Sequence, residues 1–270
     1  MSERLTAKRP LVLVGAGKMG GALLEGWLAS GIEPNLITVV DPAVDKGVAP
    51  FNTRGLTTTD TLPEKPVGVI VIAVKPHLVA EVLPTLATAH DERTMLLSVA
   101  AGVPIAKLKT VGRGPVVRAM PNTPAGIGKG ATVAVADGAS NAEIAIADAL
   151  LSAVGKTWWM KDEPLMDAVT GVSGSGPAYV FHMVEALTAA GIAEGLPPEL
   201  AAGIARQTVV GAGALLGRSP LEAATLRENV TSKGGTTAAA LGVLRDSGAL
   251  TELMTKAVKA AAARSRELGS

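Results

Sequence analysis

Two short stretches of this chain combine glycines with helix-forming residues in a way that favours binding of an anion. GAGKMG occupies residues 15–20, and TSKGGTTAAAL occupies residues 231–241. The first turn of a helix presents N–H groups without intrahelical partners at the positive end of the helix dipole, and glycines let a ligand approach the backbone. Each stretch therefore predicts a helix that begins at an anion site.

The first stretch fits the dinucleotide-binding pattern G-x-G-x-x-G, in which the glycines make a tight turn, admit the pyrophosphate and let helix and strand pack closely. It overlaps the end of an apolar run at residues 11–17, and a second apolar run ends at Asp41. A tight turn without a ligand would explain the glycines but not this context. We therefore predict that a dinucleotide binds to Gly15, Ala16, Gly17, Lys18, Met19 and Gly20.

Asp41 bears on the choice of cofactor. A carboxylate at this strand end accepts a hydrogen bond from the ribose 2′-OH and repels a 2′-phosphate, so it favours NADH. The alternative is that Asp41 only begins a turn with Pro42, and the nearest following cations are Lys46 and Arg54. The sequence predicts NADPH or NADH and leaves the preference open.

Two further strand ends belong to the same site by position, because ligands of open α/β sheets bind at the carboxyl ends of the strands. They are AVKP, residues 73–76, and the MPN of AMPNTP, residues 119–124. For each motif taken alone, the alternative is that it only ends a strand and begins a loop. The predicted cofactor contacts here are Ala73, Val74, Lys75, Pro76, Pro121 and Asn122.

The elements that must position these motifs change character along the chain. Apolar, β-branched runs at 11–17, 36–41, 67–76, 94–102, 115–121 and 131–137 alternate with helical patterns at 20–30, 77–90 and 141–154. Such alternation predicts an open parallel sheet covered by helices. Beyond Pro164 the pattern is helical throughout, at 176–194, 197–217, 220–229, 236–247 and 250–268. We predict an α/β chain with a Rossmann-like dinucleotide-binding domain at 1–161 and an all-helical domain at 162–270.

Composition narrows the class of partner. The 25 basic and 24 acidic residues nearly cancel, which gives no electrostatic signature for nucleic acid or an anionic membrane. Cysteine is absent and the three histidines are far apart in sequence, so no metal site is expected. The polar N-terminus does not resemble a signal peptide, and no apolar stretch approaches the ~20 residues that span a bilayer. We expect a cytoplasmic protein with a small-molecule ligand.

Six motifs occur together and in order: GAGKMG, AVKP, SVAAGV at 98–103, MPNTP, DAVTGVSGSGPAYVF at 167–181 and NVTSKGGTTAAAL at 229–241. The series closely resembles the pyrroline-5-carboxylate reductase family over essentially the whole chain. The resemblance implies reduction of the cyclic imine Δ1-pyrroline-5-carboxylate to L-proline with NADPH or NADH. It also implies a homodimer with interleaved helical domains, often assembled into a larger ring, and a nicotinamide near the MPNTP and SGSGPAY loops.

The resemblance also suggests what the second stretch holds. It implies that N–H groups at Gly235–Thr237 of the partner subunit bind the substrate carboxylate and that the Thr237 hydroxyl, the catalytic group, lies near the ring nitrogen. A capped helix without a ligand is the alternative, and Glu163 is either a counter-charge to the ring nitrogen or a carboxylate at a helix N-terminus. The implied substrate-binding residues are Glu163, Asn229, Ser232, Gly235, Thr236 and Thr237, and Ala100 and Ala101 join the cofactor contacts.

Lys233 departs from the family pattern, which usually has proline before the paired glycines. Two rival functions remain. Dehydrogenases of the β-hydroxyacid or ketopantoate reductase kind use a lysine early in the long helix, but residues 176–187 contain none. A nucleotide-binding protein without turnover is the other rival, since a fold alone does not give a function.

Overall fold

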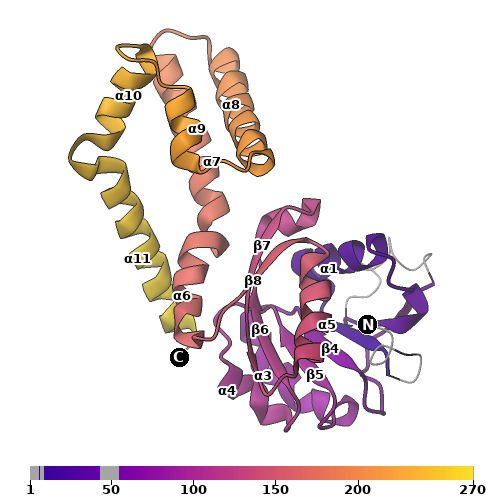
Figure 1. Cartoon of the computed structure of the whole chain (residues 1–270). Helices are drawn as coiled ribbons and strands as arrows, with labels where there is room; N and C mark the ends of the chain where they lie inside the picture. The colour runs from indigo at the N-terminus through magenta and orange to yellow at the C-terminus, as the bar shows by residue number, and fades with distance from the viewer. Residues whose placement is uncertain (1–5, 7–8, 43–54, 270) are drawn as a thin grey trace. The chain divides into compact units, whose positions relative to one another are not determined.

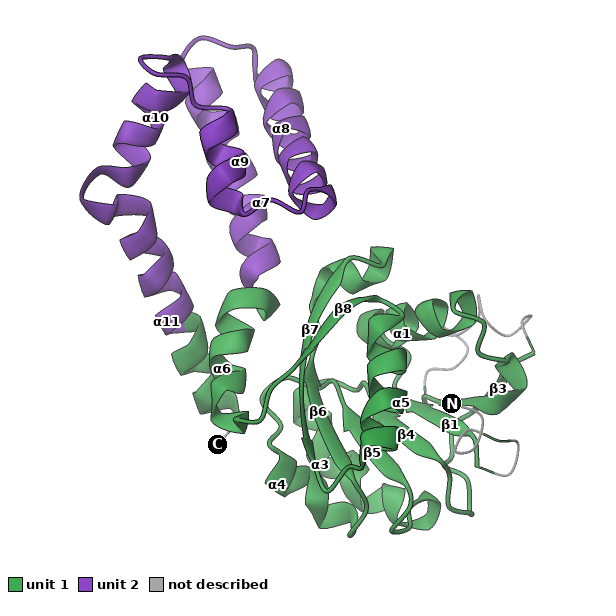
Figure 2. Ribbon diagram, in the orientation of Figure 1, with its two compact units in different colours: residues 1–174, 261–270 green, residues 175–260 purple. Residues whose placement is uncertain are grey.

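The structure, a computed structural model, describes residue 6, residues 9–42 and residues 55–269. The chain divides into two compact units, residues 1–174 with 261–270 and residues 175–260 (Figures 1 and 2). The predicted domain boundary at 161/162 lies earlier than this division. The end of the last helix returns to the first unit, where the Ser265 hydroxyl donates to Asp167 Oδ1 at 2.6 Å. Lys46 and Arg54 lie outside the described residues.

An eight-stranded sheet forms the centre of the first unit, in the order β3-β2-β1-β4-β5-β6-β7-β8. All six predicted strands are present, mostly shorter than predicted. The order reverses between β1 and β4, and this switch point is where open α/β sheets bind their ligands. The strands are β1 (Leu11–Val14), β2 (Ile37–Val40), β3 (Thr57–Thr59), β4 (Val69–Ile72), β5 (Met95–Ser98), β6 (Val116–Met120), β7 (Gly130–Asp137) and β8 (Gly155–Trp159).

The prediction of an all-parallel sheet is wrong at one end. β7 pairs antiparallel with β6, and β8 is parallel to β7. The connection from β6 to β7 spans residues 121–129, which is too short for the crossover that a parallel neighbour needs. β3 and β8 were not predicted from the sequence. β3 has only three residues, and β8 is an edge strand without buried residues, so neither carries a strong apolar signal.

Two apolar layers cover the sheet. Leu11 and Leu13 pack with α1 (Lys18–Ala29) and α5 (Asn141–Ser152), whereas Val12 and Val14 pack with the helices of the opposite face. These are α3 (Val79–Val82), α4 (Ile105–Leu108) and the 3₁₀ helix η4 (Leu83–Ala89). The helix predicted at 77–90 is therefore mostly 3₁₀. Pro84 lies inside it and cannot donate a helical hydrogen bond.

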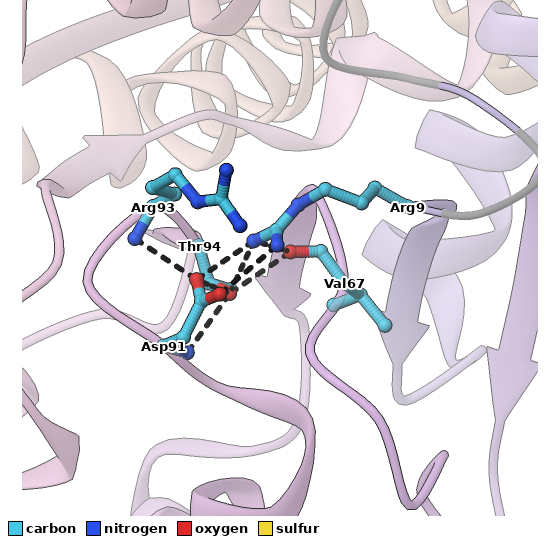
Figure 3. A network of polar contacts seen from close by, with 5 residues as sticks. All are labelled: Arg9, Val67, Asp91, Arg93 and Thr94. Carbon is cyan, nitrogen blue, oxygen red and sulfur yellow. Dashed lines mark hydrogen bonds and ion pairs between the residues drawn. The ribbon is translucent and has the colours of Figure 1, made fainter.

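A polar network ties the chain before β1 to the turn before β5 (Figure 3). The Arg9 guanidinium binds both carboxylate oxygens of Asp91, at 2.9 and 2.7 Å, and donates to the Val67 carbonyl at 2.8 Å. Thr94 Oγ1 donates to the same carbonyl at 2.9 Å. Hydrogen bonds from Arg9 hold the pKa of Asp91 well below its usual range.

This network predicts a loss of stability in acid. The folded-state pKa of Asp91 is below its unfolded value, so its contribution is fully present above about pH 4 and is lost as pH falls further. Asp91→Asn should lower the free energy of unfolding by about 1–2 kcal/mol at pH 7, because bonds to a charged acceptor are weakened. It should also flatten the pH dependence below pH 4. Urea unfolding between pH 3 and 7 tests this, with exposed Glu92→Gln as the control. Parallel pH curves for wild type and Asp91→Asn would contradict it.

The second unit is helical, as predicted. Its helices are α7 (Gly176–Ala193), α8 (Pro198–Arg218), α9 (Ala223–Asn229), α10 (Thr236–Arg245) and most of α11 (Ala249–Gly269). Before α7, the first unit ends in α6 (Met166–Val169) and a π-helix, Thr170–Gly174.

The helices of the second unit leave much apolar surface uncovered. Within residues 175–260 the buried apolar side chains are those of Ala201 and Ala205, whereas Phe181 is 63% exposed and Val243 is 74% exposed. Exposed apolar surface of this extent marks an interface with another molecule. The expectation that no stretch could span a bilayer is wrong by length and composition alone, since α8 has 21 residues and its most apolar window has a mean hydropathy of 1.3.

Candidate active site

The glycine loop between β1 and α1 has a geometry that other residues would not allow. Gly15 has φ +94°, and a Cβ on Gly20 would lie 2.0 Å from the Gly15 carbonyl oxygen. A Cβ on Gly17 would meet no atom within 4 Å. Gly17 is also the N-cap of α1, with no side-chain cap. The turn is therefore closed at its base and open at Gly17, which is where a diphosphate would approach the backbone.

A cavity of about 790 Å³ lies beside this loop. Its size lies within the range of small-molecule and cofactor sites. Of the predicted cofactor contacts, the cavity is lined by Gly15, Gly17, Asp41, Ala73, Val74 and Lys75. The structure thus places the glycine loop, the end of β2 and the end of β4 around the same cavity. This arrangement fits a dinucleotide.

Part of the cavity lining was not predicted from the sequence. Asp60, Glu64 and Glu81 line it together with Asp41. Among the described residues, the lining therefore contains four carboxylates and one lysine, Lys75. Asp60 and Glu64 follow the short strand β3, which the sequence did not reveal, and they match no motif. Among the described lining residues carboxylates outnumber lysine four to one, and this charge balance does not favour an additional phosphate.

Asp41 has a role within the protein as well. Its Oδ2 accepts a hydrogen bond from the Ala16 N–H at 2.7 Å. The end of β2 is thereby joined to the glycine loop. Asp41 does more than begin the turn with Pro42, which was the alternative considered from the sequence.

The other strand ends lie along β5 and β6. Asn122 Oδ1 accepts from the Ala131 N–H at 2.8 Å, and its Nδ2 donates to the Ser173 carbonyl at 3.0 Å. Ala100 is buried, with its N–H directed to Ser98 Oγ at 3.3 Å, and Ala101 is half-buried. Pro121 is buried directly after β6. Asn122 thus has well-defined protein partners at both ends of its amide.

Glu163 forms an ion pair that the sequence did not predict. Its Oε1 accepts from Arg118 Nη1 on β6 at 2.8 Å and from the Ile105 N–H at the start of α4, also at 2.8 Å. Arg118 is 8% exposed, so its charge needs this partner. Glu163 therefore interacts with the N-terminus of a helix, as one alternative held, but that helix is α4 and not its own.

The turn before α10 has uncapped N–H groups. Gly235 is the N-cap, no side chain caps the helix, and Gly234 has φ +71°. The Gly235 N–H, which was predicted to face an anion, donates to the Ser232 carbonyl at 3.1 Å and closes the turn. The first-turn groups of Thr236 and Thr237 are the donors that this geometry offers. Thr237 is half-buried, whereas Asn229, Ser232 and Thr236 are exposed.

Comparison with known proteins gives separate matches for the sheet-containing part and the helical part of the chain. Residues 163–268 match the family model for pyrroline-5-carboxylate reductase dimerisation, and residues 10–102 match that for NADP oxidoreductase, coenzyme F420-dependent. The chain is 40% identical to a pyrroline-5-carboxylate reductase of Arabidopsis thaliana over 261 residues, which cover 94% of each protein.

Solved structures give the same result. The pyrroline-5-carboxylate reductase of Coxiella burnetii superposes with a TM-score of 0.89 at 34% identity, over 97% of this chain and 99% of that one. The Plasmodium falciparum pyrroline carboxylate reductase with NADP bound has a TM-score of 0.76 at 28% identity, over 98% of this chain and all of the other.

The Rossmann-type sheet with its glycine loop, followed by a helical dimerisation region, defines an NAD(P)H-dependent oxidoreductase that forms homo-oligomers. The matches along nearly the whole chain are more specific. The chain belongs to the pyrroline-5-carboxylate reductase family, and it is a reductase of proline biosynthesis.

Proposed function

We propose that this chain reduces Δ1-pyrroline-5-carboxylate to L-proline, with the cofactor in the glycine-loop cavity and the substrate carboxylate at the N-terminus of α10 of the partner subunit. The observation that carries the proposal is the uncapped start of α10, with Gly235 as N-cap and no side-chain oxygen on its N–H groups. The N–H groups of Thr236 and Thr237 bind the substrate carboxylate there, assisted by the helix dipole. Asn229 and Ser232 hold or line the turn.

Thr237 is the proposed catalytic residue. NAD(P)H, when bound, supplies the hydride, and the protein supplies position and electrostatics. The hydroxyl of Thr237 forms a hydrogen bond with the ring nitrogen, which carries a proton in the reactive imine. Reduction of such an imine needs no general base, and this agrees with the lack of lysine at residues 176–187. Glu163 acts indirectly, because its carboxylate already accepts hydrogen bonds from the Arg118 side chain and from the Ile105 N–H at the start of α4.

The glycine loop and the strand ends hold the cofactor. The N–H groups of residues 17–20 at the start of α1 face the diphosphate, Gly17 leaves room for it, and Ala16, whose N–H donates to Asp41, adjoins it. The residues that surround the nicotinamide half follow β4, β5 and β6, on the side of the switch point away from β2, and they are Ala73–Pro76, Ala100, Ala101, Pro121 and Asn122. For each residue, contact with the cofactor is part of the proposal; Asn122 contributes its backbone, because both ends of its side-chain amide bind protein groups.

A second copy of the chain completes the molecule. The match at residues 163–268 to a dimerisation family and the exposed apolar side chains of α7–α11 support a homodimer. The apolar face of α8 then packs against protein and not against a bilayer. We also propose the larger ring of dimers, the cytoplasmic location, the absence of nucleic-acid and membrane partners, and the functional division at residues 161/162.

Asp41 favours NADH over NADPH in this proposal, and the carboxylates of Asp60, Glu64 and Glu81 in the same cavity act in the same direction. Asp41→Ser should raise the ratio of NADPH to NADH affinity by about tenfold, since repulsion of a 2′-phosphate is relieved by roughly 1.4 kcal/mol. Fluorescence titration with both cofactors measures the ratio. Glu81→Gln, in α3 and not in the strands beside Asp41, should change it less, and an unchanged ratio for Asp41→Ser would remove Asp41 from cofactor choice.

The test of the proposed function is turnover by the purified protein of three substrates in parallel. Pyrroline-5-carboxylate should be reduced with consumption of NAD(P)H, whereas a β-hydroxyacid should not be oxidised with NAD(P)⁺. Oxidation of the hydroxyacid would favour the dehydrogenase rival. The six-membered cyclic imine tests how closely the site fits its ring, and cofactor binding without turnover of any substrate would favour a binding protein.

A further inference from the structure

Asn122 joins two motifs that are about fifty residues apart in the chain. Its amide nitrogen donates to the Ser173 carbonyl at 3.0 Å, with a sequence separation of 51 residues. Its amide oxygen accepts from the Ala131 N–H at 2.8 Å. The MPNTP turn after β6 is therefore bonded on one side to β7 and on the other to the SGSG segment.

Pro177 explains why the Ser173 carbonyl needs a side-chain partner. In a continuous α-helix this carbonyl would accept from the N–H of residue 177, but proline has none, and its ring clashes with the carbonyl four residues earlier. The Ala178 N–H donates elsewhere, to the Ser175 carbonyl at 3.0 Å. The helical path is interrupted accordingly, with a π-helix at Thr170–Gly174 and α7 beginning at Gly176. The amide of Asn122 replaces the donor that Pro177 lacks.

The hydrogen bond from Asn122 to the Ser173 carbonyl, here called the clamp, lies at the edge of the sheet where the cofactor's reactive half is expected. Asn122 follows the carboxyl end of β6, on the side of the switch point away from β2 and the glycine loop. The segment it holds packs closely there, since a Cβ on Gly174 would lie 2.5 Å from Met120 Cε. The position of the Ser173–Gly174 backbone thus depends on β6 through one hydrogen bond and one close contact.

We propose that Asn122 is a positioning residue, whose amide replaces the N–H missing at Pro177 and so fixes the Ser173–Gly174 backbone against β6. This inference rests on the proposed function of the site. Hydride transfer needs the reacting atoms at about 3–3.5 Å, and small displacements of the surrounding backbone are costly. The clamp therefore acts on the rate of the chemical step, not on affinity for the cofactor.

The test is a double-mutant cycle between Asn122→Ala and Pro177→Ala. Asn122→Ala should lower kcat about tenfold, as expected for one unsatisfied carbonyl, and leave the NADH dissociation constant within about twofold. Pro177→Ala restores an N–H at residue 177, so the double variant should regain at least about threefold in kcat relative to Asn122→Ala. Pro177→Ala alone is the control. The midpoint of urea unfolding should show the same partial recovery, and it does not depend on activity.

Two results would overturn the inference. A raised NADH dissociation constant with unchanged kcat would make Asn122 a direct cofactor contact, and a double variant no better than Asn122→Ala would break the link to Pro177. If Asn122→Ala does not fold, Asn122→Asp is used in the same cycle, because it keeps the acceptor for the Ala131 N–H. Wild-type protein that binds NADH but does not reduce pyrroline-5-carboxylate would instead contradict the proposed function.

Discussion

Thr237→Ala is expected to lower kcat for pyrroline-5-carboxylate at least about 100-fold, the usual cost of removing a catalytic hydrogen-bonding group. Thr237 is half-buried and lies in the first turn of α10, whose N–H groups no side chain caps. Removing it should leave the backbone donors for the substrate carboxylate in place, so KM should change much less than kcat. Affinity for NADH should not change, because the glycine loop belongs to the other compact unit.

Thr237→Ser is the matched control, since it keeps the hydroxyl and loses only a methyl group. It should retain most of the activity. Steady-state rates together with NADH titrations separate the two effects. If Thr237→Ala turned over at the wild-type rate, Thr237 would have no part in the reaction.

Gly20→Ala is expected to abolish cofactor binding within the measurable range. The added Cβ would lie 2.0 Å from the Gly15 carbonyl oxygen, a backbone atom that can move away only if the loop is displaced. Each hydrogen bond to a charged phosphate contributes about 1.5–3 kcal/mol, so losing two weakens binding at least about 100-fold. The overpacked loop should also lower the free energy of unfolding by about 1–3 kcal/mol.

The neighbouring glycine provides the control for this variant. A Cβ on Gly21 would lie 3.8 Å from the nearest atom, the Ala16 carbonyl oxygen, which is ordinary contact. Gly21→Ala should therefore bind NADH like the wild type and be at least as stable, because alanine favours the helix. Fluorescence titration of both variants checks the pair. Equal affinities would mean that close packing at Gly20 does not shape the cofactor site.

The alternation of β-branched runs and helical patterns was enough to predict the Rossmann-like sheet, its glycine loop and the five helices from residue 176 onward. These features are encoded locally, by strand and helix periodicity and by Gly and Pro at element ends. The antiparallel direction of β7 follows from the length of the connection at residues 121–129, which is too short for a crossover, and the alternation of patterns alone does not reveal it. β3 and β8 were missed because neither is long and buried.

The side-chain contacts of the site residues could not be predicted from the sequence either. Sequence motifs suggested where Asn122, Glu163 and Gly235 lie along the chain, but not which groups they contact. The ion pair of Glu163 with Arg118 and the bond from Asn122 to Ser173 join segments brought together only by the fold. The Gly235 N–H was expected to face an anion, and it closes its own turn.

The measurement that tests the central claim most directly is the oxidation of NADH and NADPH, followed by nicotinamide absorbance, with pyrroline-5-carboxylate and purified protein. We predict turnover with both cofactors, faster at low concentrations of NADH than of NADPH, and formation of one L-proline for each cofactor oxidised. Absence of turnover with either cofactor, in protein that still binds them, would contradict the assignment of imine reduction to this site.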